Sequence, residues 1–134
     1  MGVTFGPELF LGKSLTVSIS NIKSDNGVIY LTLYDDAEAF AQSSMTTYVT
    51  YEVIEAQKGQ MTLSISGLRG GPLAAVFFHD ENSNSNFDMS GGLPTEGWGY
   101  SNNVGKETLP SFDEAAFEMK ADKSNMIITM NYIN

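Results

Sequence analysis

The stretch of sequence that decides the fold is Leu-Ala-Ala-Val-Phe-Phe at residues 73–78, where every residue is apolar. A strand that is covered on both faces has this composition, because neither of its sides meets water. The neighbouring segments differ, since they alternate between apolar and polar residues as strands with one solvent-facing side do. The alternating segments lie at residues 15–20, 29–33, 49–53, 61–65, 117–119 and 126–132. The sequence therefore predicts one central strand among six half-buried strands.

Most connections between these strands are short. Residues 24–27, Ser-Asp-Asn-Gly, form a turn signal that predicts a hairpin between the first two strands. Residues 36–41 can form a helix with Asp36 as N-cap and Phe40 facing inwards, but two turns make a crossover and not a layer. Residues 80–109 are too long for an ordinary hairpin loop, and long loops are often functional. We expect an all-β fold, a seven-stranded antiparallel β-sandwich of the immunoglobulin-like or transthyretin-like kind, with this one long loop.

Length and composition limit the classes of protein to which the chain can belong. Its 134 residues fit one domain, which we place at residues 13–134 after an N-terminal extension or expression remnant at residues 1–12. The 16 acidic and 7 basic residues give a formal net charge of −9, which repels nucleic acid and anionic lipid. No apolar run approaches the roughly 18 residues of a membrane helix, so we expect no membrane insertion. The absence of cysteine excludes thiolate metal sites, and the single histidine excludes any two-histidine site.

Oxygen-bearing side chains recur at every second position at the start of the long loop. Calcium loops wrap a hard cation with this spacing, and the match to the first part of an EF-hand begins with Asp80 as position 1. The later positions depart from an EF-hand, because Ser85 replaces its glycine and Gly91 replaces its bidentate glutamate. A sixth ligand must come from elsewhere, and Glu96 is the nearest spare carboxylate. The sequence predicts a Ca²⁺ site with the ligands Asp80, Asn82, Asn84, Asn86, Asp88 and Glu96.

The distribution of charge favours the same hypothesis. Four carboxylates lie between Gly70 and Gly105, a span that contains neither Lys nor Arg. A divalent cation would relieve the repulsion among them and order the loop. The alternative is a solvated surface turn, because Asn and Asp are common in turns for local backbone reasons.

Three further segments carry a resemblance to a known family. They read AVFFHDENSN at 75–84, LPTEGWGYSNN at 93–103 and PSFDEAAF at 110–117. Their order and spacing resemble the bacterial family called domain of unknown function 2141, and the similarity extends over residues 13–134. Members commonly read Asp-Glu-Asn-Gly-Asn-Gly in the loop, where this chain has Ser83 and Ser85. The resemblance implies no activity but implies export, so we expect a periplasmic or extracellular protein whose signal peptide is absent from this chain.

His79, Trp98 and Tyr100 are the other candidate site residues, which we place on a binding surface beside the loop. His79 directly precedes the alternating stretch from Asp80 to Asp88, which we call the acidic loop. A histidine at a strand end more often holds the backbone by hydrogen bonds than acts as a general base. Trp98 and Tyr100 lie among glycines, where they could stack on a sugar or a peptide, or simply cap the edge of the sandwich.

We therefore expect a non-enzymatic module in which the Ca²⁺ loop orders a binding or structural surface. Its partner would be an unknown protein or polysaccharide of the cell envelope. The rival hypothesis is a hydrolase or lyase that acts on an envelope polymer with His79 and the acidic loop, although the sequence shows no paired catalytic geometry for it. A third hypothesis is an adhesive domain in which the metal provides mechanical strength.

Overall fold

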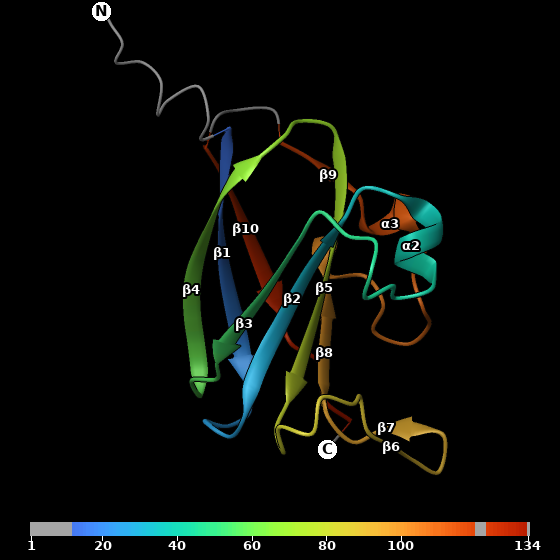
Figure 1. Ribbon diagram of the computed structural model, residues 1–134. Helices are drawn as coiled ribbons and strands as arrows, with labels where there is room; N and C mark the ends of the chain where they lie inside the picture. Colours follow the sequence, from blue (N-terminus) through green and yellow to red (C-terminus); the bar gives the residue numbers. More distant parts are fainter. Residues whose placement is uncertain (1–11, 120–122, 134) are drawn as a thin grey trace, which may run out of the picture.

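The computed structural model describes residues 12–119 and 123–133, which form a mostly β domain (Figure 1). One sheet has three strands, in the order β10 (Lys123–Thr129), β1 (Lys13–Ile22) and β4 (Gly59–Leu68). The other has the order β3 (Thr50–Glu55), β2 (Val28–Tyr34), β5 (Pro72–Asp80) and β8 (Gly97–Tyr100), with β9 (Phe117–Glu118) pairing with the start of β5. A separate hairpin joins β6 (Met89–Ser90) to β7 (Leu93–Pro94). The strand pairs are antiparallel except β1 with β10, which is parallel and departs from the antiparallel expectation.

The alternating residues of the first two strands build the core between the two sheets. Leu15, Val17 and Ile19 of β1 contact a cluster that includes the inward-facing residues of β2, and each is at most 1% exposed. The inward-facing residues of β2 are Ile29, Leu31 and Leu33. Because side chains alternate across a strand, the residues between them face away from this core. The structure confirms the inward face that the sequence predicts for β1 and β2.

Strand β5 is the central strand that the apolar run at 73–78 predicts. It pairs with β2 along one edge and with β8 along the other. Phe77 is fully buried in the core between the sheets, whereas its neighbour Phe78 lies on the opposite face. The register places Phe78 opposite Tyr30 of β2 and opposite Trp98 of β8.

Two short helices cover one end of the outer face of the larger sheet (Figure 1). Helix α2 (Ala37–Ala41) begins at the N-cap Asp36, as predicted, and packs the ring of Phe40 against Tyr34 at a centroid distance of 6.0 Å. Helix α3 (Phe112–Ala115) begins with a capping box. The side chain of Ser111 accepts a hydrogen bond from the backbone N–H of Glu114, and the side chain of Glu114 accepts one from the backbone N–H of Ser111. Both helices pack in one small cluster at this end, so they leave the remainder of the outer face without a covering layer.

The predicted hairpin between the first two strands is wrong, because β1 and β2 belong to different sheets. The turn itself is present, and Gly27 adopts a left-handed φ of 69° there. A Cβ atom at Gly27 would lie 1.9 Å from the carbonyl oxygen of Asp80, so only glycine fits this position. The turn therefore serves as a corner that passes the chain from one sheet to the other.

Two further expectations need correction. The alternating apolar residues of 49–53 face outwards, and Val53 is 51% exposed. The long loop is also more ordered than expected, because 80–109 contains β6, β7, β8 and the 3-10 helix η1 (Ser101–Asn103). The extension expected at residues 1–12 lies outside the described residues, apart from Gly12. In the described part of the chain, no helix is long and apolar enough to cross a membrane.

Candidate functional site

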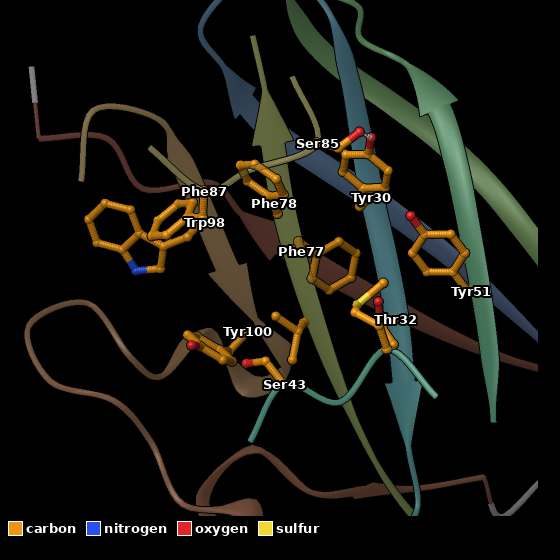
Figure 2. A pocket seen from close by; sticks show the side chains of 12 residues that line it. Tyr30, Thr32, Ser43, Tyr51, Phe77, Phe78, Ser85, Phe87, Trp98 and Tyr100 are labelled. Atoms are coloured by element: carbon orange, nitrogen blue, oxygen red, sulfur yellow. Dashed lines mark hydrogen bonds between the residues drawn. The ribbon is translucent and has the colours of Figure 1, made fainter. Parts of the chain in front are cut away.

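The uncovered part of the larger sheet forms a groove of about 370 Å³ (Figure 2). We call it the aromatic groove, because rings from four neighbouring strands and from the acidic loop line it. The outer face of such a sheet is ordinarily polar, since it meets water. The aromatic residues that line the groove with outward-facing rings are Tyr30, Tyr51, Phe78, Phe87, Trp98 and Tyr100.

The rings form a continuous row across the strands. Tyr30 lies between Tyr51 and Phe78, with centroid distances of 5.8 Å and 5.5 Å and interplanar angles of 22° and 17°. Phe87 then meets Phe78 edge-on at 5.1 Å and Trp98 at 6.5 Å. Aromatic pairs on neighbouring strands stabilise one another as well as the sheet. The row is therefore a built surface and not a set of isolated exposed residues.

Hydroxyl groups supply the polar side of the groove. Thr32, Ser43 and Ser85 line it together with the tyrosines, and Tyr30 Oη lies 3.3 Å from Ser85 Oγ (dashed line in Figure 2). Burial raises the pKa of Tyr51 and Tyr100 above its ordinary value, so these phenols stay protonated and can donate hydrogen bonds at neutral pH. Among the described residues, none that lines the groove is charged.

The acidic loop begins at Asp80, which is 0% exposed although it ends an outward-facing row of β5. Backbone N–H groups donate to both of its carboxylate oxygens, from Asn84 to Oδ1 at 3.2 Å and from Ser85 to Oδ2 at 2.7 Å. Ser83 and Ser85 have left-handed φ values of 55° and 66°. Glycine adopts this conformation at less cost than serine does.

Glu96 joins the two ends of the acidic loop. Its Oε2 accepts from the backbone N–H of Glu81 at 3.0 Å, and its Oε1 accepts from the N–H of Asp88 at 3.1 Å. The side chain is only 3% exposed, and burial raises its pKa above the ordinary value despite these hydrogen bonds. The carboxylates of Asp88 and Asp80 act in the same direction as burial.

Asp88 occupies the more open side of the loop, where the side-chain amides of two asparagines donate to it. Asn82 Nδ2 lies 2.8 Å from Asp88 Oδ2, and Asn84 Nδ2 lies 3.0 Å from both carboxylate oxygens. These hydrogen bonds lower the pKa of Asp88. Asn86 is exposed and donates its backbone N–H to Asn84 Oδ1 at 2.9 Å.

The structure thus brings the six predicted metal ligands into one hydrogen-bonded network, which Asn86 joins through its backbone N–H. Within residues 12–119 and 123–133, no three Asp, Glu or His side chains converge closely enough to hold a metal by themselves. A cation would therefore need the amide oxygens of Asn82 and Asn84, which now direct their N–H groups at Asp88. Each carboxylate oxygen of Asp80 and Glu96 accepts one of the N–H groups above and has a second lone pair to offer. Carboxylate and amide oxygens are the ligands that a hard cation such as Ca²⁺ prefers, but here the amide oxygens of Asn82 and Asn84 accept backbone N–H groups of Asn84 and Asn86.

The acidic loop is also a wall of the aromatic groove, because Ser85 and Phe87 belong to both. Sequence reasoning found Trp98 and Tyr100 but missed Tyr30, Tyr51, Phe78 and Phe87. The signal that could have revealed them is the aromatic residue at a position that alternation assigns to water, as for Tyr30 between Ile29 and Leu31.

His79 does not belong to this binding surface. It is 0% exposed and faces the core side of β5, away from Phe78 and the groove. Its Nε2 lies 2.7 Å from the Asn26 carbonyl oxygen and its Nδ1 lies 2.8 Å from Tyr132 Oη. A carbonyl only accepts, so in the neutral ring Nε2 carries the proton and Nδ1 accepts from Tyr132. The histidine holds the turn at Asn26 against the C-terminal segment.

Comparison with family models matches residues 17–127 to domain of unknown function 2141, described as an uncharacterized protein conserved in bacteria. The chain belongs to this family. The match includes the acidic loop and the strands that line the aromatic groove, so both lie within the domain that defines domain of unknown function 2141. No curated protein and no solved structure is significantly similar to the chain.

Proposed function

We propose that this member of domain of unknown function 2141 is an exported, non-enzymatic binding module that works in the periplasm or outside the cell. We further propose a β-sandwich of the immunoglobulin-like or transthyretin-like kind, with the aromatic groove as its binding surface. One observation carries the proposal: six aromatic side chains line an uncovered sheet face next to a hydrogen-bonded loop. Concave, mostly apolar surfaces with a few polar groups are the usual form of ligand sites.

The proposal includes Ca²⁺ in the acidic loop, where it would fix the wall of the groove. Asp80, Asn82, Asn84, Asn86, Asp88 and Glu96 are the proposed ligands. Ser85 and Phe87 lie between these metal-binding residues in the chain. A bound cation would therefore restrict the motion of the Ser85 and Phe87 side chains, which line the groove. Ca²⁺ would neutralise the carboxylates and make the loop rigid, so its proposed role is structural and not catalytic.

The geometry gives less support to the alternative of an envelope polymer hydrolase or lyase. His79 is buried with a partner on each ring nitrogen, and both oxygens of Asp80 and Glu96 accept backbone N–H groups. General acid–base catalysis needs a titratable group within reach of the substrate. None of the described residues that line the groove is a carboxylate or an imidazole, and the raised pKa of the Tyr51 and Tyr100 phenols keeps them protonated.

A calcium titration of chelator-treated protein tests the proposal with two readouts. Thermal unfolding reports metal binding, and the emission of Trp98 reports the groove, because it is the single tryptophan and packs against Phe87. At free Ca²⁺ of about 100 times the dissociation constant, binding adds roughly 2.7 kcal/mol and raises Tm by about 8–10 °C. Mg²⁺ should raise Tm less, because it holds its water ligands tightly and requires near-ideal octahedral coordination.

Variants separate the two parts of the proposal. Asn82→Ala removes an exposed ligand and should weaken the Ca²⁺ response, whereas Asn125→Ala on β10 should leave it unchanged. Phe87→Ala should retain the rise in Tm but lose the change in Trp98 emission. If millimolar Ca²⁺ moves neither Tm nor emission, the calcium proposal is wrong. If Tm rises without any change in emission, the metal stabilises the fold but does not order the groove.

A further inference from the structure

We propose that the aromatic groove binds a neutral polysaccharide, and that it holds about one or two sugar rings of the chain at a time. This inference rests on the proposed function, because it names the class of ligand for the same surface. Four properties of the groove select this class: its mixture of rings and hydroxyls, its lack of charge, the pairing of its two floor strands on both edges, and its size.

The lining matches the two-sided chemistry of a sugar. A pyranose ring has a face of C–H groups that packs on aromatic rings, and an edge of hydroxyls that both donate and accept hydrogen bonds. The groove offers the rings of Tyr30, Phe78 and Trp98 in one row for the first, and tyrosine, serine and threonine hydroxyls for the second. Hydroxyls suit a sugar because they can reverse their donor and acceptor roles.

The strands beneath the groove argue against an extended peptide. A peptide that joins a sheet needs a free strand edge for its backbone hydrogen bonds. Strands β2 and β5, which form the floor of the groove, are paired on both edges. A peptide laid across them would leave its own N–H and C=O groups without backbone partners, which is costly in an apolar site. Sugar hydroxyls can bond to side-chain hydroxyls and to water instead.

Charge argues against an ionic ligand. The protein carries a formal net charge of −9 and the acidic loop forms one wall of the groove, so anionic polymers are repelled. A cation could favour the ring faces, but the nearby carboxylates of Asp80 and Glu96 point their oxygens at backbone N–H groups of the loop. None of the described lining residues supplies a carboxylate to pair with an ammonium group.

The size and ends of the groove are consistent with a segment of a longer chain. Its volume of about 370 Å³ lies near the small end of the range of about 300–1,000 Å³ for ligand sites. The row of rings runs across the strands from Tyr51 to Trp98, with Ser85 on one side of it and Ser43 on the other. Figure 2 shows Ser85 above this row and Ser43 below it, so a sugar chain that lies along the row could continue past both of its ends.

The test measures binding of neutral hexasaccharides of glucose, N-acetylglucosamine, xylose and mannose to the full chain, with and without Ca²⁺. Calorimetry gives affinity, and Trp98 emission shows whether the groove is occupied. The comparators are polygalacturonate as an anionic polymer, choline as a cation and a proline-rich peptide. We expect saturable binding of at least one neutral hexasaccharide with little dependence on salt, and no binding of the three comparators.

Variants assign the binding to the groove. Trp98→Ala and Tyr30→Ala should each weaken the affinity by about tenfold or more, which is the loss of one stacked ring at about 1.4 kcal/mol per factor of ten. Phe87→Ala gives the same test at a ring that is 39% exposed, where folding is least at risk. Tyr30→Phe should cost less than Tyr30→Ala, since it keeps the ring. Ile127→Ala, on the other sheet and 68% exposed in the wild type, should change nothing.

Three results would overturn the inference. The first is a failure of all four neutral hexasaccharides to bind; if Ca²⁺ still alters Trp98 emission, the proposed calcium-ordered groove stands while its ligand class is wrong. The second is saturable binding of choline, polygalacturonate or the peptide in place of a sugar. The third is sugar binding that groove variants leave unchanged. Sugar binding without any Ca²⁺ effect would instead support this inference and contradict the calcium proposal.

Discussion

Glu96→Gln tests the hydrogen bonds by which Glu96, directly before β8, holds the two ends of the acidic loop. The substitution changes one carboxylate oxygen to an NH₂ group. Both carboxylate oxygens of Glu96 accept backbone N–H groups, from Glu81 and Asp88, at 3.0 and 3.1 Å. An amide has only one oxygen, so one of these N–H groups would face the NH₂ of the new side chain. The site is 3% exposed, which leaves little water to replace the lost bond. An unsatisfied buried donor costs about 1–3 kcal/mol.

The assay is urea and thermal unfolding of Glu96→Gln at neutral pH in chelator, so that metal binding does not contribute. The expected loss corresponds to a fall in Tm of about 3–10 °C for a domain of this size. Glu107→Gln makes the same chemical change at an exposed loop position and should stay within about 0.5 kcal/mol of wild type. If Glu96→Gln is as stable as Glu107→Gln, the two hydrogen bonds do not hold the loop and the reasoning is refuted.

Two further predictions concern the same region. The hydrogen bonds from Asn84 and Asn82 lower the pKa of Asp88 below its ordinary value of 3.8, so its contribution to stability is present above that value and is lost as pH falls through the folded pKa. The stability difference between wild type and Asp88→Asn, measured in chelator, should therefore be larger near pH 7 than near pH 3; an opposite slope contradicts the direction of the shift. Gly97→Ala would place a Cβ 2.3 Å from the ring of Tyr132 and should cost about 1–3 kcal/mol in denaturant unfolding. Gly70→Ala should cost little, because its Cβ would meet the flexible Lys13 side chain at 3.3 Å and the Met119 carbonyl oxygen at an ordinary contact distance of 3.8 Å.

The sequence predicts the core better than the pairing of the strands. Alternation identified the inward residues of β1 and β2, because a one-residue shift would expose the whole set. The turn at Asn26 and Gly27 was also recognisable, but a turn signal is local and does not reveal whether the next strand stays in the same sheet. Here the chain crosses to the other sheet, and β1 pairs with β4 and the distant β10. Such pairings depend on contacts between residues far apart in sequence.

The candidate site shows the same division between local and distant information. Alternating Asp and Asn residues identified the acidic loop, and the need for a sixth ligand in place of Gly91 pointed to Glu96, which the structure brings to Glu81 and Asp88. The aromatic groove could not be recognised in this way. Phe78 stands in an apolar run that indicates burial on both faces, and only the position of α2 and α3 at one end of the sheet leaves its side uncovered. That placement is a property of the tertiary structure.

Amide hydrogen exchange with and without Ca²⁺ tests most directly the claim that the acidic loop orders the binding surface. We predict that Ca²⁺ increases the protection of residues 81–103, which include Phe87 and Trp98 of the groove, while β1 and β4 change little. These two strands pair with each other in the three-stranded sheet and serve as internal controls. Unchanged exchange at 81–103 in saturating Ca²⁺, or an equal change along the whole chain, would contradict the account.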